Sequence, residues 1–290
     1  MIKVSIIMPV YNGESTIDNS IKSCINQSET NFELIIIDNG SIDDTKKRVQ
    51  KYSDDKRIKY VYTEKKGRSR ARNIGIKNSK GKYLLFLDSD DTINKELLTN
   101  GISFLDKNTS YFGYSVAVEY KFVENAKKSL YIPSTEKDML YLNNQFPINS
   151  IMLRNNNIIY FHEDIEHNED WLFFLENLLN KNIYVDINFV GANVWVHQNN
   201  TMKNLTVMIC SKLYIRGKFR ELFPNNFKIA LDNLKLLFYV VFLFEEQDKY
   251  SPSKYFKKQY QLVRLFKRLP FINRYIYSKL SNKLKLNVYS

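Results

Sequence analysis

Apolar runs alternate with amphipathic stretches through the first 90 residues, and no other feature of the sequence restricts the fold as much. The pattern predicts four strands, at residues 4–10, 32–37, 58–62 and 83–87. It also predicts helices between them, at residues 14–27, 46–52 and 70–78. Buried strands that alternate with helices are typical of an α/β protein, in which helices cover both faces of a mostly parallel sheet.

The later part of the sequence is organised differently. Between about residues 110 and 200 the pattern is mixed, with short strands expected near 111–118 and 183–190 and a helix at 171–179. Beyond residue 204 the pattern predicts helices separated by prolines, at 206–222, 227–246 and 253–268. We therefore predict one domain over residues 1–204, followed by a helical extension over residues 205–290.

The positive charge of the chain is concentrated in that extension. The formal net charge is +12, yet the first 200 residues hold 25 basic and 26 acidic side chains. Residues 249–290 contain eleven Lys or Arg and no Asp or Glu. A near-neutral domain followed by a basic tail suggests that the tail meets a polyanion or an anionic membrane.

Cysteine usage and the N-terminus favour a cytoplasmic protein. Cys24 and Cys210 lie far apart and lack the spacing of a zinc site, so we expect two free thiols in a reducing compartment. The apolar stretch at the N-terminus is too short for a secretory signal. The chain also lacks the G-x-G-x-x-G and G-x-x-x-x-G-K-[ST] motifs, which argues against a dehydrogenase or a P-loop NTPase.

Polar clusters stand at the carboxyl ends of the predicted strands, where ligands bind in sheets of this kind. The clusters are Tyr11-Asn12, Asp38-Asn39 and Asp88-Ser89-Asp90-Asp91. Three carboxylates within four positions repel one another unless a cation lies among them. Their oxygens suit Mg²⁺ or Mn²⁺, completed by phosphate oxygens of a substrate. The alternative is a solvated acidic turn, but the place after a buried strand favours a metal site.

Five segments give the chain a resemblance to a known family. They are SIIMPVYNGE, FELIIIDNGSIDDT, GRSRARNIGI, GKYLLFLDSDD and the stretch at residues 148–173. In this order they resemble the family-2 inverting glycosyltransferases with the GT-A fold, over about residues 2–200. The resemblance implies a nucleotide-binding sheet with a donor half at residues 1–95 and an acceptor half at residues 96–204.

The resemblance also assigns roles at the strand ends. It implies that Asp90 holds Mn²⁺ or Mg²⁺, that Asp88 lies near the metal and contacts the ribose, and that Asp91 is a reserve ligand. The other donor-binding residues are expected to be Pro9, Tyr11, Asn12, Asp38, Asn39, Arg70, Arg72 and His197. Asn39 stands where the family has a second acid. A UDP-sugar still fits, because an amide can accept from uracil N3–H and donate to a ring carbonyl.

Some of these residues also have a purely structural interpretation. Arg70 and Arg72 can lie on a solvated helix face, and His197 can be an ordinary hydrogen-bonded side chain. His162 and His167 suggest zinc, but they are five positions apart where the metalloprotease motif needs four, so we interpret HEDIEH as a polar surface segment.

Asp170 is the candidate general base. Asn168 is expected to cap a helix that places Glu169 and Asp170 in its first turn. Acidic residues favour that position through the helix dipole alone, so the residues by themselves leave a structural role open. The resemblance implies that the second acid of this pair deprotonates the acceptor hydroxyl.

The extension allows two interpretations. The apolar run at residues 236–244 is too short to cross a bilayer. Together with the aromatic side chains interleaved with Lys and Arg, it suggests a basic amphipathic surface at a membrane. The alternative is a helical subdomain that packs on the catalytic domain or on another subunit. A lipid-linked acceptor at the inner leaflet explains the basic tail more simply than nucleic acid does.

The resulting prediction is a metal-dependent inverting hexosyl- or N-acetylhexosaminyltransferase. It would move a sugar from a nucleotide-diphosphate donor, a UDP-sugar, to a hydroxyl of a bacterial cell-surface glycan or polyprenyl-linked acceptor. The alternatives are a sugar-phosphate nucleotidyltransferase and a non-catalytic, membrane-docked scaffold that binds nucleotide sugars. An anionic membrane surface and a second copy of the chain are the other expected partners, with the protein peripheral on the inner face of the membrane.

Overall fold

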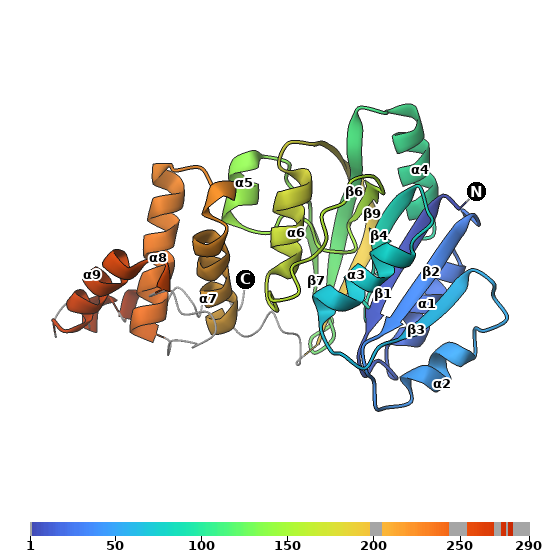
Figure 1. The fold of residues 1–290 in the computed structure, drawn as a ribbon, viewed down its shortest axis with the longest axis horizontal. Coiled ribbons are helices and arrows are strands. Elements are labelled where there is room, and N and C mark those ends of the chain that lie inside the picture. The colour runs from blue at the N-terminus through green and yellow to red at the C-terminus, as the bar shows by residue number, and fades with distance from the viewer. Residues whose placement is uncertain (1, 198–204, 244–253, 270–273, 277, 281–290) are drawn as a thin grey trace. The chain divides into compact units, whose positions relative to one another are not determined.

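The computed structural model describes residues 2–197, 205–243, 254–269, 274–276 and 278–280. The chain divides into two compact units, residues 1–198 and 199–290. The first unit contains the sheet and the second is helical (Figure 1). Each unit is described by itself.

Four parallel strands form one half of the sheet in the order β3-β2-β1-β4. They are β1 (Val4–Val10), β2 (Phe32–Asp38), β3 (Ile58–Tyr62) and β4 (Tyr83–Phe86). The helices between them are α1 (Ile17–Ile25), α2 (Thr45–Gln50) and α3 (Arg68–Asn78). Every residue of β1, β2 and β4 is buried, and this burial on both faces explains the unbroken apolar runs in the sequence.

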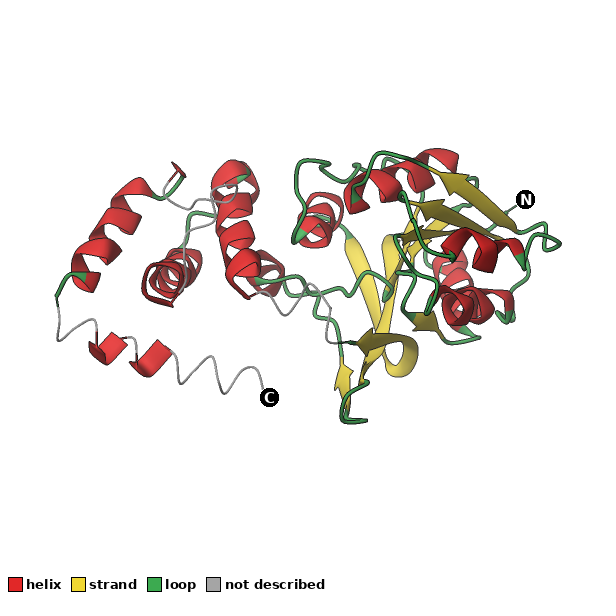
Figure 2. Ribbon diagram, turned by 90° about the horizontal axis from the view of Figure 1, so that it is seen from below, coloured by secondary structure: helices red, strands yellow, loops and turns green. Residues whose placement is uncertain are grey.

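Different helices cover the two faces of this parallel half (Figure 2). Helix α1 and helix α4 (Leu97–Lys107) pack on the face that carries Ile6 and Met8. Helix α3 packs on the other face, where Ala71 meets Ile35 and Ile37. Alternate residues of a strand point to opposite faces, so each apolar strand contributes to both layers.

The other half of the sheet is mixed, and it continues in the order β4-β8-β6-β9-β5, with β7 also paired to β6. Its strands are β5 (Thr92–Ile93), β6 (Tyr111–Phe122), β7 (Lys128–Tyr131), β8 (Ile151–Arg154) and β9 (Asn182–Val196), with helices α5 (Lys137–Leu142) and α6 (Glu169–Leu178). Strand β8 runs antiparallel to β4 and β6. Strands β6 and β9 are longer than the short strands predicted, because backbone pairing continues where polar, half-exposed residues interrupt the apolar pattern.

The ends of the parallel strands place the polar clusters at one edge of the sheet. Val10 pairs with Asp38 at the ends of β1 and β2. Strand β4 pairs with β1 as far as Phe86 and Ile7, and Asp88 follows two residues later. The polar clusters identified in the sequence therefore share one edge.

The second unit is built from helices around its own apolar core. Helices α7 (Leu205–Lys218), α8 (Phe227–Leu243) and α9 (Lys257–Lys267) contribute to it, and a 3-10 turn, η2, spans Arg220–Leu222. The buried core residues from α8 are Leu236, Leu237, Val240, Val241 and Phe242. The apolar run that suggested a membrane surface is thus largely the core of this unit, because an amphipathic helix buries its apolar side against neighbouring helices. Within the described residues, no helix is both long and apolar enough to cross a bilayer.

Gly75 sets how closely α3 approaches β1, and this gives a test of the fold. A Cβ at Gly75 would lie 2.3 Å from Ile7 Cγ2, whereas a Cβ at Gly101 in α4 would meet the flexible end of Met152 at 2.9 Å. Both Gly→Ala changes gain about 1 kcal/mol of helix propensity. We expect Gly75→Ala to lower the free energy of unfolding by about 1–3 kcal/mol, because the stiff β-branched Ile7 cannot move aside.

Gly101→Ala is the matched control, and it should be nearly neutral or stabilising. Thermal and urea unfolding of both variants measure the difference. Equal stability of the two variants would contradict the close packing of α3 on β1.

Candidate active site

The turn after β2 is held by the side chain of Asp38. One carboxylate oxygen, Oδ1, accepts from the Ser41 backbone N–H at 2.8 Å, and the other accepts from the Tyr60 hydroxyl. On the first strand's side, the Asn12 backbone N–H donates to Ser41 Oγ at 2.9 Å, and Asn12 Oδ1 accepts from the Ile42 backbone N–H at 3.0 Å. Asn12 has a φ of 51°, a conformation that Asn tolerates better than most residues. These contacts bring the first two polar clusters together.

Asn39 connects this turn to the start of α3. Its Oδ1 accepts from the Gly67 backbone N–H at 3.0 Å, which leaves the amide NH₂ group as its donor. Tyr11 is half-exposed at the same edge, where the Lys66 ammonium donates to its hydroxyl at 2.7 Å. Pro9 is buried beyond the last β1–β4 pair, where its missing N–H costs no ladder bond.

The acidic segment after β4 contains three carboxylates in different environments. Asp88 Oδ1 accepts from Arg72 Nη2 at 2.9 Å. Burial works to raise the pKa of Asp88, but the Arg72 and Arg68 guanidiniums hold it below its ordinary value. Asp91 is engaged at both oxygens, by the Trp195 backbone N–H at 3.0 Å and Asn149 Nδ2 at 3.1 Å.

Asp90 is the carboxylate that remains open. Within the part of the chain that the structure describes, its side chain makes no hydrogen bond or ion pair with another residue and accepts only from its own backbone. Burial and the charge of Asp88 raise its pKa, while His197 and Arg68 oppose that rise. Asp90 is half-buried beside a like charge, an arrangement that a cation stabilises, so it fits a divalent ion.

The described side chains alone do not complete the coordination shell of a metal ion. No group of three or more His, Cys, Asp or Glu side chains among the described residues has the arrangement of a metal site. Asp90 and the second oxygen of Asp88 are the groups that fit, whereas the contacts of Asp91 with β9 and Asn149 occupy the reserve ligand. A Mg²⁺ ion usually takes one or two carboxylates and completes its shell with phosphate oxygens and water.

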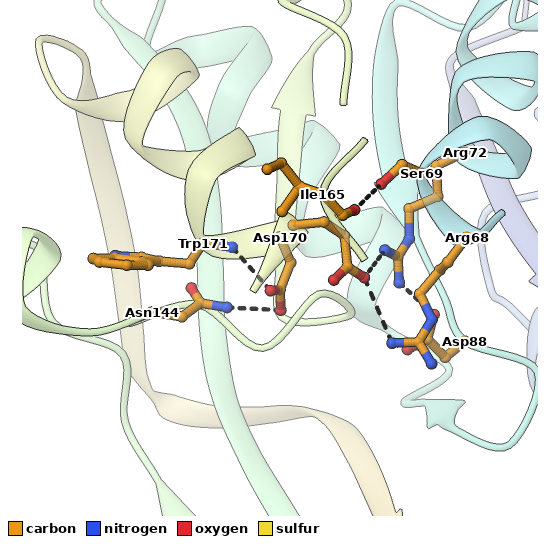
Figure 3. Close-up of polar contacts among 9 residues, drawn as sticks. Arg68, Ser69, Arg72, Asp88, Asn144, Ile165, Asp170 and Trp171 are labelled. Atoms are coloured by element: carbon orange, nitrogen blue, oxygen red, sulfur yellow. Dashed lines mark hydrogen bonds and ion pairs between the residues drawn. The ribbon is translucent and has the colours of Figure 1, made fainter. Parts of the chain in front are cut away.

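The buried guanidinium of Arg72 connects the acidic segment after β4 to the start of α6 (Figure 3). Arg72 Nη1 donates to Glu169 Oε1 at 2.9 Å, and Arg72 Nη2 donates to Asp88 Oδ1 at the same distance. The Arg72 and Glu169 side chains are 2% and 4% exposed, so this is an ion pair shielded from water. Burial works against the charge, yet the neighbouring carboxylates raise the pKa of Arg72 above its ordinary value. Arg72 is therefore not on a solvated helix face.

Helix α3 also forms hydrogen bonds with the chain segment that leads into α6. Ser69 Oγ donates to the Ile165 carbonyl at 3.2 Å, and the Asn73 side chain exchanges two hydrogen bonds with the Phe161 backbone, both at 2.9 Å. Phe161 and Ile165 are buried. The HEDIEH segment is thus more than the polar surface predicted from sequence, because Ile165 within it is buried and bonds to Ser69, while Phe161 just before it is bonded to Asn73.

The other two arginines of α3 differ in what they contact. Arg70 pairs with Glu163 at 3.6 Å and is not part of the Arg72 cluster. Arg68, which the sequence analysis missed, pairs with Glu169 at 3.5 Å and is half-exposed. The sequence did contain a signal for Arg68: it stands four positions before Arg72, and residues four apart lie on one face of a helix.

Asp170 follows Glu169 in the first turn of α6 and is fixed at both oxygens (Figure 3). Its Oδ1 accepts from the Trp171 backbone N–H at 2.9 Å, and its Oδ2 accepts from Asn144 Nδ2 at 2.8 Å. Burial, followed by the charge of Glu169, raises its pKa to about 6, against the opposing effect of Arg72 and Arg68. A carboxyl with a pKa near neutrality can exchange a proton at physiological pH.

The expected cap of this helix is wrong in one respect. Asn168 does precede α6, but its backbone is left-handed, with a φ of 56°, and its side chain makes no capping hydrogen bond. A side-chain cap normally requires an extended backbone at that position. Asp170 itself accepts a first-turn N–H instead.

His197 follows β9 and lies close enough to Asp90 to influence its titration. The described geometry therefore brings together Asp88, Asp90, Asp170, Arg72 and His197, with Glu169, Arg68, Asn144 and Asn149 as residues that sequence reasoning did not single out. A separate part of the same edge holds Pro9, Tyr11, Asn12, Asp38 and Asn39.

Comparison with known proteins identifies the family. The family model described as glycosyl transferase family 2 matches residues 5–162. An uncharacterized glycosyltransferase of Haemophilus influenzae is 37% identical over 182 residues, which are 60% of this chain and 71% of the relative. The UDP-Glc:alpha-D-GlcNAc-diphosphoundecaprenol beta-1,3-glucosyltransferase WfgD of Escherichia coli is 32% identical over 223 residues, 75% of this chain and 87% of that one. Other relatives are longer: the chain spans 45% of the length of an uncharacterized glycosyltransferase of Rickettsia conorii.

Solved structures show the fold. The crystal structure of residues 1–349 of Staphylococcus aureus TarS in complex with UDP-GlcNAc matches with a TM-score of 0.64 at 19% identity, and the match covers 97% of this chain and 92% of that one. This likeness confirms the GT-A-type fold that the sequence predicts: a sheet flanked by helices, with further helices at the C-terminus. The chain belongs to glycosyl transferase family 2.

Proposed function

We propose that this chain transfers a hexosyl or N-acetylhexosaminyl group from a UDP-sugar to a hydroxyl of a cell-surface glycan or lipid-linked acceptor, with inversion. One observation carries the proposal: the half-buried carboxyl of Asp170 adjoins Glu169, which Arg72 links through ion pairs to Asp88 in the acidic segment after β4. Burial also raises the pKa of Asp170 to about 6. The names of relatives support the substrate class, since WfgD is named for a UDP-Glc donor and a diphosphoundecaprenol acceptor.

Asp170 is the proposed general base. Each of its oxygens accepts one hydrogen bond, and a carboxylate offers about four lone-pair sites, so capacity remains for an acceptor hydroxyl. The acceptor oxygen attacks the anomeric carbon as its proton passes to Asp170. The bond from that carbon to the diphosphate oxygen breaks, and its electron pair leaves with the diphosphate. Attack opposite the leaving group inverts the configuration.

The departing diphosphate carries negative charge that the site must balance. Asp90, with the second oxygen of Asp88, would hold Mn²⁺ or Mg²⁺, which when bound supplies Lewis-acid stabilisation of that charge. Arg68 lies near Asp90 and adds positive charge, and His197 lies near the same carboxylate. Asp88, which Arg72 holds by an ion pair, would also accept from the ribose.

The nucleotide is proposed to lie along the turn after β2. The amide NH₂ of Asn39 would donate to a uracil carbonyl, because its oxygen already accepts from Gly67. The exposed ring of Tyr11 offers a face for the base, and Pro9, Asn12 and Asp38 shape the pocket wall. Arg70, half-exposed beside Glu163, would contact the base or phosphate.

The basic tail is proposed to meet an anionic membrane surface through α9. Tyr260 and Val263 are buried in the helical core, whereas Leu262 and Leu265 are 51% and 57% exposed on the opposite side. Lys258 lies one turn before Leu262, on the same face. Apolar side chains lined by cations suit the interface of an anionic bilayer, where each cation contributes about 1 kcal/mol. A peripheral site would bring the enzyme to a lipid-linked acceptor.

The base assignment is tested by Asp170→Asn. We expect the rate of transfer to fall by ~10²–10⁴, because Asn cannot take the proton, while the affinity for UDP changes little. In the wild type, kcat/KM should fall as pH drops below about 6, as Asp170 becomes protonated. Ionised Asp170 opposes folding at pH 7, since its folded-state pKa is raised, so the substitution should not lower the Tm.

Glu176→Gln is the control, because Glu176 lies on the same helix but pairs with His162 at 2.9 Å. UDP release with UDP-GlcNAc or UDP-Glc and an acceptor mixture measures the rates. Turnover of Asp170→Asn at the wild-type rate would remove Asp170 as the base.

The metal assignment is tested by Asp90→Asn. Wild-type protein should bind UDP more tightly with Mn²⁺ than without it, and Asp90→Asn should lose that increment and ~100-fold or more of the rate. Calorimetric titration of UDP at fixed Mn²⁺ measures the increment. Asp106→Asn, which changes an acid paired with Lys82, should retain it. An undiminished Mn²⁺ effect in Asp90→Asn would place the metal elsewhere.

The membrane assignment is tested with α9 in the full chain. Leu262→Gln combined with Leu265→Gln should abolish sedimentation with anionic vesicles, whereas Leu231→Gln, which changes an exposed residue of α8, should not. Binding of the wild type should weaken at high salt, because the Debye length is only ~8 Å at physiological ionic strength. Wild-type protein that ignores anionic vesicles at low salt would favour a packing role for the extension.

A further inference from the structure

We infer that Asn144 is a positioning residue for the base: its amide fixes the direction of the Asp170 carboxylate and favours the ionised form that accepts the proton. The inference rests on the proposed role of Asp170 and adds a residue from a different part of the chain. Asn144 follows α5, 26 positions before Asp170.

The orientation of the Asn144 amide is determined by its two contacts. Its Oδ1 accepts from the Phe146 backbone N–H at 3.1 Å, so its NH₂ group must face Asp170 Oδ2, at 2.8 Å. The reversed amide would bring an NH₂ group against an N–H and an oxygen against a carboxylate. Asn144 can therefore only donate to Asp170, and donation favours the ionised carboxylate.

The segment that carries Asn144 is itself fastened to the surrounding structure. Trp171 Nε1 donates to the Leu140 carbonyl at 2.7 Å, which ties α6 to the end of α5. The buried Gln145 side chain donates to the Met139 and Asn143 carbonyls, both at 3.3 Å, and the Tyr131 hydroxyl donates to the Gln145 carbonyl at 3.1 Å. The amide of Asn144 is held in place before any substrate arrives, as a positioning group requires.

Charged groups on several elements act on the ionisation of Asp170 in opposite directions. On its own helix Glu169 disfavours the ionised form, while Arg72 and Arg68 of α3 favour it. Tyr120 of β6 is near enough for Asp170, after burial, Tyr131 and Asp91, to contribute to the raised pKa of its hydroxyl. Asn144 is a neutral side-chain donor to Asp170, so its removal changes no charge in the site.

Two tryptophan backbone amides allow the ionisation of Asp170 to be measured directly. The chain has two tryptophans, Trp171 and Trp195. The backbone N–H of Trp171 donates to Asp170, and that of Trp195 donates to Asp91. Selective ¹⁵N-tryptophan labelling of the full chain therefore gives two backbone amide signals, and the Trp171 signal reports the ionisation of Asp170 without any substrate.

We expect the Trp171 amide of the wild type to titrate with a midpoint near pH 6, and Asp170→Asn to abolish that titration. Asn144→Ala should raise the midpoint by about one unit, because the carboxylate loses a charge-assisted hydrogen bond. Asn144→Asp, which keeps the size of the side chain, should raise it further, since it sets a like charge against Asp170. The Trp195 amide is an internal reference for an intact fold.

Gln145→Ala is the matched control, because it loosens the same segment without touching Asp170. Its Trp171 midpoint should stay at the wild-type value. An unchanged midpoint in both Asn144 variants would overturn the inference, as would an equal rise in Gln145→Ala, which would assign the effect to the segment as a whole. The transfer rate of Asp170→Asn tests the base itself, so failure of the proposed function and failure of this inference give different results.

Discussion

The buried guanidinium of Arg72 is the contact on which the rest of the site depends. It comes from a helix on one face of the parallel half of the sheet, and it pairs with Asp88 after β4 and with Glu169 at the start of α6. A charge so shielded from water is tolerated only when it is paired and hydrogen-bonded, and removing one partner of such a pair typically costs about 3–5 kcal/mol. The geometry of both carboxylates is therefore linked through one side chain.

This linkage leaves the site short of positive charge. The arginines that pair with its acids are Arg72 and the half-exposed Arg68. The site has five acidic side chains: Asp88, Asp90, Asp91, Glu169 and Asp170. Burial, followed by the charge of neighbouring carboxylates, raises the pKa values of Asp90, Asp91 and Asp170, the acids that no arginine pairs with directly. Such a site gains stability from an added cation and keeps a base ready near neutral pH, which are the two requirements of the proposed transfer.

The helical extension shows how one apolar run can serve two interpretations. Residues of α8 that suggested a membrane surface are buried among α7, α8 and α9, because a short apolar run on an amphipathic helix is satisfied equally well by a protein core. The exposed leucines of α9 carry the membrane proposal instead. Sequence periodicity cannot separate these uses, since both place apolar residues at the same spacing.

The sequence by itself determined the parallel half of the sheet, because strands buried on both faces have unbroken apolar runs that few other structures produce. It also determined that Asp38, Asp88 and Asp90 share one edge, since parallel strands end on the same side. It did not predict the length of β6 and β9, whose pairing extends through polar residues, nor the left-handed Asn168. Only the tertiary structure decided that Arg72 is buried, that Asp91 is engaged by Trp195 and Asn149, and that Asn144 meets Asp170. These contacts join residues from about 16 to 104 positions apart, and no local pattern records which distant side chains will meet.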